Sequence, residues 1–240
     1  MRESLPTELR RTFANAAGGR QPQPERKYHK DDAYLCYGLK TAIFDDILKE
    51  FRPRFMELSL AQRMELAQNL VRESIGELSH TGLHILALSV KELSPDHFMI
   101  LSSLFDHFSS WSHVDHLCLE SIRPLLFKYR EETLALLAEW NLSPNKWKRR
   151  ASVVAFVRKV AKSGEFTSGA LQMCENLVFD REDIVQKGVG WALKDNLRSA
   201  PALVLPYIKE LRRRGVSSTI TLYAIRDLRG AEREEILHIK

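Results

Sequence analysis

The amino-acid sequence predicts an all-α protein built as a solenoid of stacked helical repeats. Apolar residues recur at spacings of three and four along most of the 240 residues, which is the period of one face of an α-helix. No convincing run of period-two alternation rich in β-branched residues occurs, so strands are not expected. Similar helical segments also recur at a nearly constant interval, and this recurrence favours a repeat protein.

Basic residues mark this interval, because five apolar segments each end in a lysine or arginine. The five are Lys91, Arg123, Arg158, Lys194 and Arg226, separated by 32, 35, 36 and 32 positions. A partner helix is expected between each pair, and helix pairs at this interval are typical of HEAT-like or armadillo repeats. One pair cannot bury its apolar face alone, so we expect stacked pairs with one continuous core and a curved concave groove. Such solenoids are most often protein-binding scaffolds, so the fold alone does not give a function.

The beginning of the chain differs from the rest. Residues 15–27, "NAAGGRQPQPERK", are rich in Gly, Pro and Gln, as loops and linkers are. We therefore expect an N-terminal helix and linker over residues 1–27 and a repeat domain over residues 28–240.

The composition indicates a cytoplasmic protein with no membrane association. The longest apolar runs are far shorter than a membrane span, and "MRESLPTELRR" lacks the apolar core of a signal peptide. The three cysteines are scattered and outside any Cys-x-x-Cys spacing, so we expect reduced thiols. They are Cys36, Cys118 and Cys174.

The formal net charge of +5 is unevenly distributed along the chain. Residues 145–240 hold 19 Lys and Arg against 11 Asp and Glu, whereas residues 1–144 hold 17 against 20. This asymmetry indicates a basic groove that attracts a polyanion. A solvated helical surface is the alternative reading of the same charges.

Residues 110–115, "SWSHVD", lie at the start of an expected buried helix. Trp111 and Asp115 are one helical turn apart, so the indole and the carboxylate project from the same face. Asp115 precedes Arg123 by eight residues, as Arg150 precedes Arg158, which predicts equivalent places in neighbouring repeats. A structural ion pair between repeats would also explain a carboxylate and a guanidinium at these places.

A second cluster, "NKWKRRA" at residues 145–151, places cations around Trp147 at the start of a helix. Cations there oppose the helix dipole, and phosphate binding is a natural reason for them. The cations are Lys146, Lys148, Arg149 and Arg150.

Trp191 lies in "QKGVGWALKD", directly after two glycines that reduce helix stability. Gly188 and Gly190 are expected to let a partner approach closely. The place of Trp191 in its repeat differs by five residues from that of Asp115, so a buried indole is an alternative reading.

Other chemistries are poorly supported. His113, Asp115, His116 and Cys118 diverge from a single helical turn, without the second cluster that a zinc site needs. His80 and His84 share a helix face, but the glutamate of a metalloprotease motif is missing. Neither a dinucleotide fingerprint, a phosphate loop nor a nucleophile elbow is present. We therefore expect neither a metal nor a cofactor.

Taken together and in this order, "SWSHVD", "NKWKRRA" and "QKGVGWALKD" resemble the DNA alkylation repair (AlkD-like) family of HEAT-like-repeat DNA glycosylases. The resemblance extends from about Tyr28 to the C-terminus. It implies that Asp115 is the catalytic aspartate and that Trp111 and Trp191 are the aromatic residues of the cleft. It implies that Arg150 binds a backbone phosphate near the lesion. Further DNA contacts are assigned to Lys148, Arg149, Lys187 and Tyr28, the last in a stretch that is one residue longer here than in the family.

The resemblance also implies a reaction. The family hydrolyses the N-glycosidic bond of cationic alkylated purines, typically N3-methyladenine and N7-methylguanine, without flipping the base. Breaking that bond builds positive charge on the sugar, which the Asp115 carboxylate and the two aromatic faces would stabilise. The expected partner is double-stranded DNA with alkylated bases, bound by a monomer because the groove must stay open for a duplex. A DNA-binding solenoid without catalysis and a protein-interaction scaffold are the two alternatives.

Overall fold

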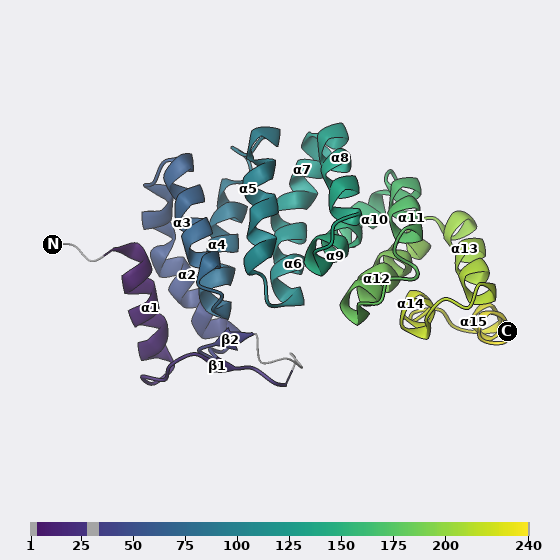
Figure 1. The fold of residues 1–240 in the computed structure, drawn as a ribbon, viewed down its shortest axis with the longest axis horizontal. Coiled ribbons are helices and arrows are strands. Elements are labelled where there is room, and N and C mark those ends of the chain that lie inside the picture. The colour runs from purple at the N-terminus through teal and green to yellow at the C-terminus, as the bar shows by residue number, and fades with distance from the viewer. Residues whose placement is uncertain (1–3, 28–33, 240) are drawn as a thin grey trace. The chain divides into compact units, whose positions relative to one another are not determined.

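The computed structural model describes residues 4–27 and 34–239, and it confirms the all-α class (Figure 1). Within these ranges the only strands are two-residue segments, β1 (Gln23–Pro24) and β2 (Leu35–Cys36). They pair antiparallel, with Gln23 opposite Cys36. The chain divides into two compact units, Met1–Ser121 and Ile122–Lys240.

The first unit is a succession of short helices (Figure 1). Helices α3 and α4 pack together most extensively, and α6 lies against α4. Helix α3 begins at a capping box, in which Ser59 and Gln62 exchange side-chain and main-chain hydrogen bonds. The helical elements are α1 (Leu5–Ala16), α2 (Thr41–Met56), α3 (Leu60–Arg72), α4 (Gly76–Ser89), η1 (Pro95–His97), α5 (Phe98–Ser103), η2 (Leu104–His107), α6 (Trp111–Leu117) and the π-helical turn η3 (Cys118–Ile122).

A buried carboxylate at the start of α4 holds the segment that follows β2. Glu77 is 8% exposed and accepts the main-chain N–H groups of Tyr37, Gly38 and Leu39 at 2.9, 2.9 and 3.1 Å. Buried main-chain donors need partners, and an ionised acceptor gives stronger bonds than a neutral one. Glu77 thereby fixes the path of the chain between β2 and α2.

In the second unit, helix α12 packs against five other helices, which are α9, α10, α11, α13 and α14 (Figure 1). The core includes Trp140 and Phe156, both fully buried. The helices are α7 (Arg123–Lys128), α8 (Arg130–Asn141), α9 (Lys146–Val154), α10 (Lys159–Ser163), α11 (Thr167–Glu175), α12 (Asp183–Ser199), α13 (Pro201–Arg213), α14 (Ser218–Ala224) and α15 (Ala231–Leu237).

Buried polar contacts connect residues that are about one repeat apart in the sequence. In the second unit, Asn141 donates to the Ser152 hydroxyl at 2.8 Å and accepts from Asn176, 35 positions later, at 2.7 Å. In the first unit, His80 contacts His116, 36 positions later. Inside each unit, contacts therefore recur at the interval that the basic residues predicted.

The basic residues that mark the interval do not all end helices. Lys91 follows α4 and Arg226 follows α14, but Arg123 begins α7 and Lys194 lies inside α12. Arg123 begins a helix because Pro124 follows it, and proline is favoured at the first turn of a helix. Lys194 lies inside α12 because Leu193 and Leu197 continue the buried face, so the helix extends to Ser199.

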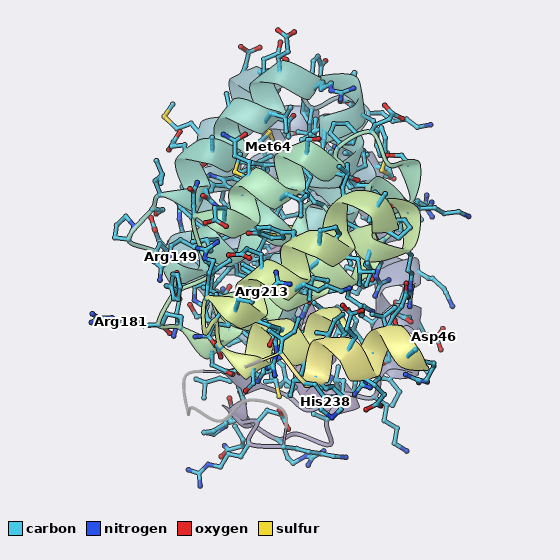
Figure 2. All side chains as sticks on the ribbon, turned by 90° about the vertical axis from the view of Figure 1, so that its right-hand side faces the viewer. Asp46, Met64, Arg149, Arg181, Arg213 and His238 are labelled. Atoms are coloured by element: carbon cyan, nitrogen blue, oxygen red, sulfur yellow. The ribbon has the colours of Figure 1, made fainter. Side chains whose placement is uncertain are left out.

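Arg181, in the segment between α11 and α12, is exposed and extends outward in Figure 2. Over the described ranges, every helix is too short or too polar to cross a membrane. Cys118 and Cys174 are buried, and Cys36 is partly buried.

We predict that Glu77→Ala lowers the free energy of unfolding by about 3 kcal/mol, because three main-chain N–H groups lose their acceptor. Urea denaturation measures this change. Glu65→Ala, on the exposed face of α3, is the control and is expected to shift stability by less than about 0.5 kcal/mol. Equal stability of the two variants would contradict the anchoring role of Glu77.

Candidate functional site

Helix α6 carries Trp111 and Asp115, and it begins where "SWSHVD" predicted a helix start. The Ser110 hydroxyl caps the helix by accepting the Ser112 N–H at 3.0 Å. Trp111 is 37% exposed and Asp115 is partly buried, one turn further along. An indole and a carboxylate are thus carried on consecutive turns of one short helix.

Polar contacts from α4 hold this helix in place. The two ring nitrogens of His80 contact the Ser112 hydroxyl and the His116 ring nitrogen, each at 3.1 Å. The His80 ring also meets the edge of His113, with ring centroids 4.8 Å apart. These contacts fix the rotation of α6 about its axis, and that rotation sets the direction of Trp111 and Asp115.

His116 on α6 and His84 on α4 favour the neutral form. Burial, together with the neighbouring His80 and His84, lowers the pKa of His116 to about 3. Burial also lowers the pKa of His84, with the Arg52 charge acting in the same direction. At neutral pH, His116 and His84 therefore add no positive charge near Asp115.

The cations at the start of α9 have partners within the fold. Asn145 caps the helix by accepting the Trp147 N–H at 2.8 Å. Lys146 lies 3.8 Å from Glu182 and over the Trp147 ring. The unfavourable cations at this N-terminus are thus partly neutralised by acids from the next repeat.

The two arginines of this cluster are held firmly. Arg149 donates to both carboxylate oxygens of Asp180, at 2.6 and 3.3 Å, and to the carbonyls of Ser143 and Pro144. Arg150 is 4% exposed, and its Nη1 donates to the Ile184 carbonyl of α12 at 2.7 Å. Arg149 therefore joins α9 to the segment before α12, and Arg150 is fixed against α12 itself.

Trp191 on α12 is partly buried, so its indole is neither fully buried nor fully exposed to solvent. Its Nε1–H donates to the Asp195 carboxylate at 3.0 Å. One turn earlier on the same helix, Lys187 is 47% exposed and pairs with Asp183 at 2.7 Å. Tyr28 lies outside the described residues.

The two glycines before Trp191 lie where neighbouring helices pack closely. A Cβ at Gly188 would meet Val153 at 3.2 Å and Arg150 at 3.4 Å, and a Cβ at Gly190 would meet Tyr223 at 2.7 Å. The partners that approach closely are therefore helices α9 and α14 of the same unit. The close approach expected at these glycines is thus made by helices of the fold itself.

The sequence did not indicate the roles of Asp195, His80 and His116. Asp195 follows Trp191 by four residues, as Asp115 follows Trp111, so both motifs read Trp-x-x-x-Asp. This recurrence was the available signal. For His80 and His116 the signal was their separation of 36 positions, which is one repeat.

The described ranges contain no group of three or more side chains that could hold a metal ion. What these residues offer is aromatic faces, a partly buried carboxylate and fixed guanidinium groups. Such a set is suited to stabilising positive charge and to holding phosphates, and less suited to redox or Lewis-acid chemistry.

Comparison with known proteins gives the class of the chain. The model of the family described as "DNA alkylation repair enzyme" matches residues 9–228, and the chain belongs to that family. A solved structure described as a predicted DNA alkylation repair enzyme from Enterococcus faecalis is similar in fold. The two share 14% identity with a TM-score of 0.73, over 83% of this chain and 91% of the other. The search of curated proteins gave no match.

We predict that Gly190→Ala lowers the free energy of unfolding by about 1–3 kcal/mol, because the added methyl group overlaps Tyr223 and the Ile220 carbonyl. Gly169→Ala in α11 is the matched control. Its Cβ would lie 4.0 Å from the nearest atoms, so alanine is expected to preserve or raise stability. Thermal unfolding of both variants measures the difference, and an equally stable Gly190→Ala would refute close packing at this position.

The lowered pKa of His116 predicts a loss of stability in acid. The unfolded chain binds a proton near the ordinary pKa of 6.5, whereas the folded chain resists it until about pH 3. The stability is therefore present above pH 6.5 and is lost as the pH falls. Between pH 7 and pH 5 the loss from this group is about 2 kcal/mol.

The measurement is urea denaturation at both pH values, for the wild type and for His116→Gln, which cannot titrate. The variant should lose less stability between pH 7 and pH 5 than the wild type. An identical loss in the two proteins would show that His116 is not the group responsible.

Proposed function

We propose that this member of the DNA alkylation repair enzyme family is a monofunctional DNA glycosylase that releases cationic alkylated purines from duplex DNA. The observation that carries the proposal is the pair of Trp111 and Asp115 on α6, one turn apart, on a helix anchored by His80 of α4. N3-methyladenine and N7-methylguanine are the expected products. The family match supports DNA alkylation repair, and the chemistry below supports the glycosylase step.

The substrate needs little acid catalysis from the enzyme. Alkylation at N3 or N7 puts a positive charge on the purine, so the base leaves without a strong acid. As the glycosidic bond breaks, positive charge moves to the deoxyribose, as in glycoside hydrolysis. The enzyme must supply a negative group at the sugar rather than a proton at the base.

In the proposal Asp115 supplies that group. Its carboxylate stabilises the oxocarbenium-like sugar and orients the attacking water. Trp111 presents an indole face from the preceding turn, and aromatic faces attract cations. The neutral His116 suits this arrangement, because a positively charged neighbour would weaken the field of the carboxylate.

The second unit is proposed to bind the DNA backbone. Arg150 is fixed against the Ile184 carbonyl, and its guanidinium is proposed to supply the positive charge that binds a phosphate. Lys148 and Lys187 add positive charge, and Trp191 adds a second aromatic face. Arg149 contributes mainly through its bonds to Asp180, which hold the start of α9. A grip on the backbone is consistent with catalysis on a base that stays stacked, with the protein acting as a monomer.

We predict that Asp115→Asn lowers the single-turnover rate of base release roughly 10²- to 10³-fold, because an amide cannot neutralise the sugar cation. The substrate is a duplex with one N7-methylguanine, and alkaline cleavage of the abasic product reports the rate. Affinity for this duplex should stay within about threefold, since Asp115 is not assigned a phosphate contact.

Asp106→Asn is the control, because Asp106 is an exposed acid of the same unit and lies nine residues before Asp115. It should release the base at the wild-type rate. An Asp115→Asn protein as fast as this control would refute the catalytic role. DNA binding by the wild type without any base release would favour the non-catalytic DNA-binding alternative instead.

A further inference from the structure

Asp195 accepts two hydrogen bonds and forms one ion pair in the second unit. Its carboxylate is 7% exposed, and Oδ2 accepts the Trp191 indole N–H at 3.0 Å and the main-chain N–H of Arg158 at 2.9 Å. Oδ1 lies 3.2 Å from the Lys194 ammonium. A buried carboxylate is stable only when it is paired in this way. Asp195 therefore joins α12 to the turn between α9 and α10.

The backbone of that turn is strained at Arg158. This residue has φ 54° and ψ −114°, a combination that costs a non-glycine residue about 1–3 kcal/mol. The bond from the Arg158 N–H to Asp195 compensates part of this cost. Strain of this kind persists where the surrounding structure enforces it, and it is concentrated at binding and catalytic sites.

The turn brings Arg158 against Trp191. The guanidinium carbon lies 5.5 Å from the centroid of the indole, within the range of a cation–π contact. One carboxylate thus fixes both members of the pair, the indole through its N–H and the arginine through its main chain. While the Asp195 bonds are intact, the indole of Trp191 and the backbone of Arg158 keep their places.

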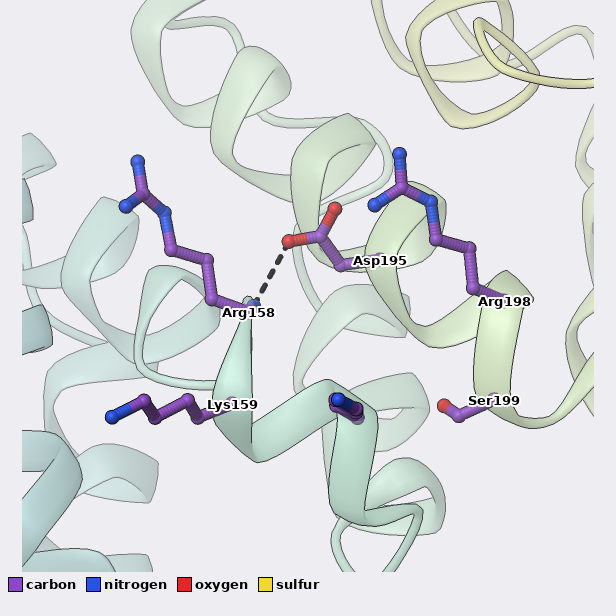
Figure 3. A pocket seen from close by; sticks show the side chains of 6 residues that line it. Arg158, Lys159, Asp195, Arg198 and Ser199 are labelled. Atoms are coloured by element: carbon purple, nitrogen blue, oxygen red, sulfur yellow. Dashed lines mark hydrogen bonds between the residues drawn. The ribbon is translucent and has the colours of Figure 1, made fainter.

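Arg158 and Asp195 line a cationic pocket of about 640 Å³ (Figure 3). Arg158 and Arg198 extend on either side of the Asp195 carboxylate in this view, and the dashed line is the Arg158–Asp195 bond. Arg198 also pairs with Asp227. The lining residues are Arg158, Lys159, Lys162, Asp195, Arg198 and Ser199.

The negative charge of Asp195 is unfavourable in a pocket that attracts phosphate. Four of the six lining side chains are cations, and a neutral asparagine would attract a polyanion more strongly than an aspartate. A carboxylate at this position therefore has another role. Its contacts with Trp191, Arg158 and Lys194 indicate that it holds these groups in place.

We propose that Asp195 is a positioning residue, which holds Trp191 and Arg158 together so that an indole face and a guanidinium meet one DNA strand side by side. In this arrangement Trp191 faces a deoxyribose of the strand, and Arg158 binds the adjoining phosphodiester. The carboxylate also enriches the indole ring in electron density through its N–H, which strengthens the attraction for a cation. This inference rests on the proposed glycosylase function.

The first test is spectroscopic and needs no catalysis. The chain has four tryptophans, so a ¹H–¹⁵N spectrum has four indole N–H resonances, and Trp191→Phe identifies the one from Trp191. Asp195→Asn should move this resonance upfield and leave the other three in place. An unmoved Trp191 resonance would overturn the proposal.

The second test separates positioning from charge and from stability. Under single-turnover conditions Asp195→Asn should slow release of N7-methylguanine from duplex DNA about tenfold, because a neutral amide oxygen holds the indole N–H and the Arg158 N–H less firmly than a carboxylate does. Its affinity for DNA should be equal to or tighter than that of the wild type, because a negative charge has left a cationic pocket. Tighter binding with an unchanged rate would overturn positioning, and so would a parallel loss of rate, affinity and melting temperature.

Glu175→Gln is the matched control. Glu175 belongs to the same unit and also holds an aromatic side chain and a cation, Tyr207 at 2.7 Å and Arg214 at 2.8 Å. It does not line the pocket, so the rate should equal that of the wild type. A tenfold loss in this variant too would reduce the effect of Asp195 to general destabilisation.

A double variant isolates the indole bond. Trp191→Phe keeps an aromatic ring but removes the N–H, so adding Asp195→Asn should slow the reaction much less than it slows the wild type. Independent, multiplicative effects would contradict the proposal. If the wild-type protein releases no base, the glycosylase function fails, and the indole resonance then decides whether Asp195 positions Trp191.

Discussion

Close packing of α12 against its neighbours is the constraint on which the second unit depends. Gly188 lets α12 approach Arg150 and Val153 of α9, and Gly190 lets it approach α14. Larger residues would separate the helices, and the Arg150 bond to the Ile184 carbonyl would lengthen. The same helix carries Trp191 and Asp195. One helix therefore fixes the proposed phosphate-binding arginine and the second aromatic face together.

The two Trp-x-x-x-Asp motifs differ in the groups that surround the aspartate. Helix α6 is held by histidines, of which His116 favours the neutral form, so Asp115 is not opposed by a charge from that residue. On α12 the carboxylate is itself the holding group, with the Trp191 N–H, the Arg158 N–H and Lys194 around it. A carboxylate with so many donors is poorly suited to react, since its charge is already satisfied. Asp195 is therefore better suited to positioning than to chemistry.

Much of the fold could be predicted from the sequence, because helical periodicity and capping are local. The start of α6 at Trp111 follows from "SWSHVD", and the interval of about 35 residues reappears in contacts such as His80 with His116. The two-residue strands β1 and β2 gave no signal, since so short a pair depends on its surroundings. The bounds of α12 depend on the burial of Leu197, which periodicity alone left ambiguous.

The site was less predictable for a physical reason. The sequence indicated which residues could do chemistry, but not which partners would hold them. The sequence suggested Arg149 as a phosphate ligand, but the structure pairs it with Asp180, 31 positions later. The sequence suggested that Gly188 and Gly190 admit a partner, and the structure packs α9 and α14 against them. Such roles depend on tertiary pairings, and a repeat interval gives neighbouring helices without giving the contacts between side chains.

The central claim is that the chain breaks the glycosidic bond of alkylated purines. Mass spectrometry of the small molecules released from methylated genomic duplex DNA, with untreated DNA beside it, tests this claim most directly. Glycosylase activity predicts free N3-methyladenine and N7-methylguanine from the methylated DNA alone, together with abasic sites in the strand. Methylated DNA that is bound but yields no free base would contradict it.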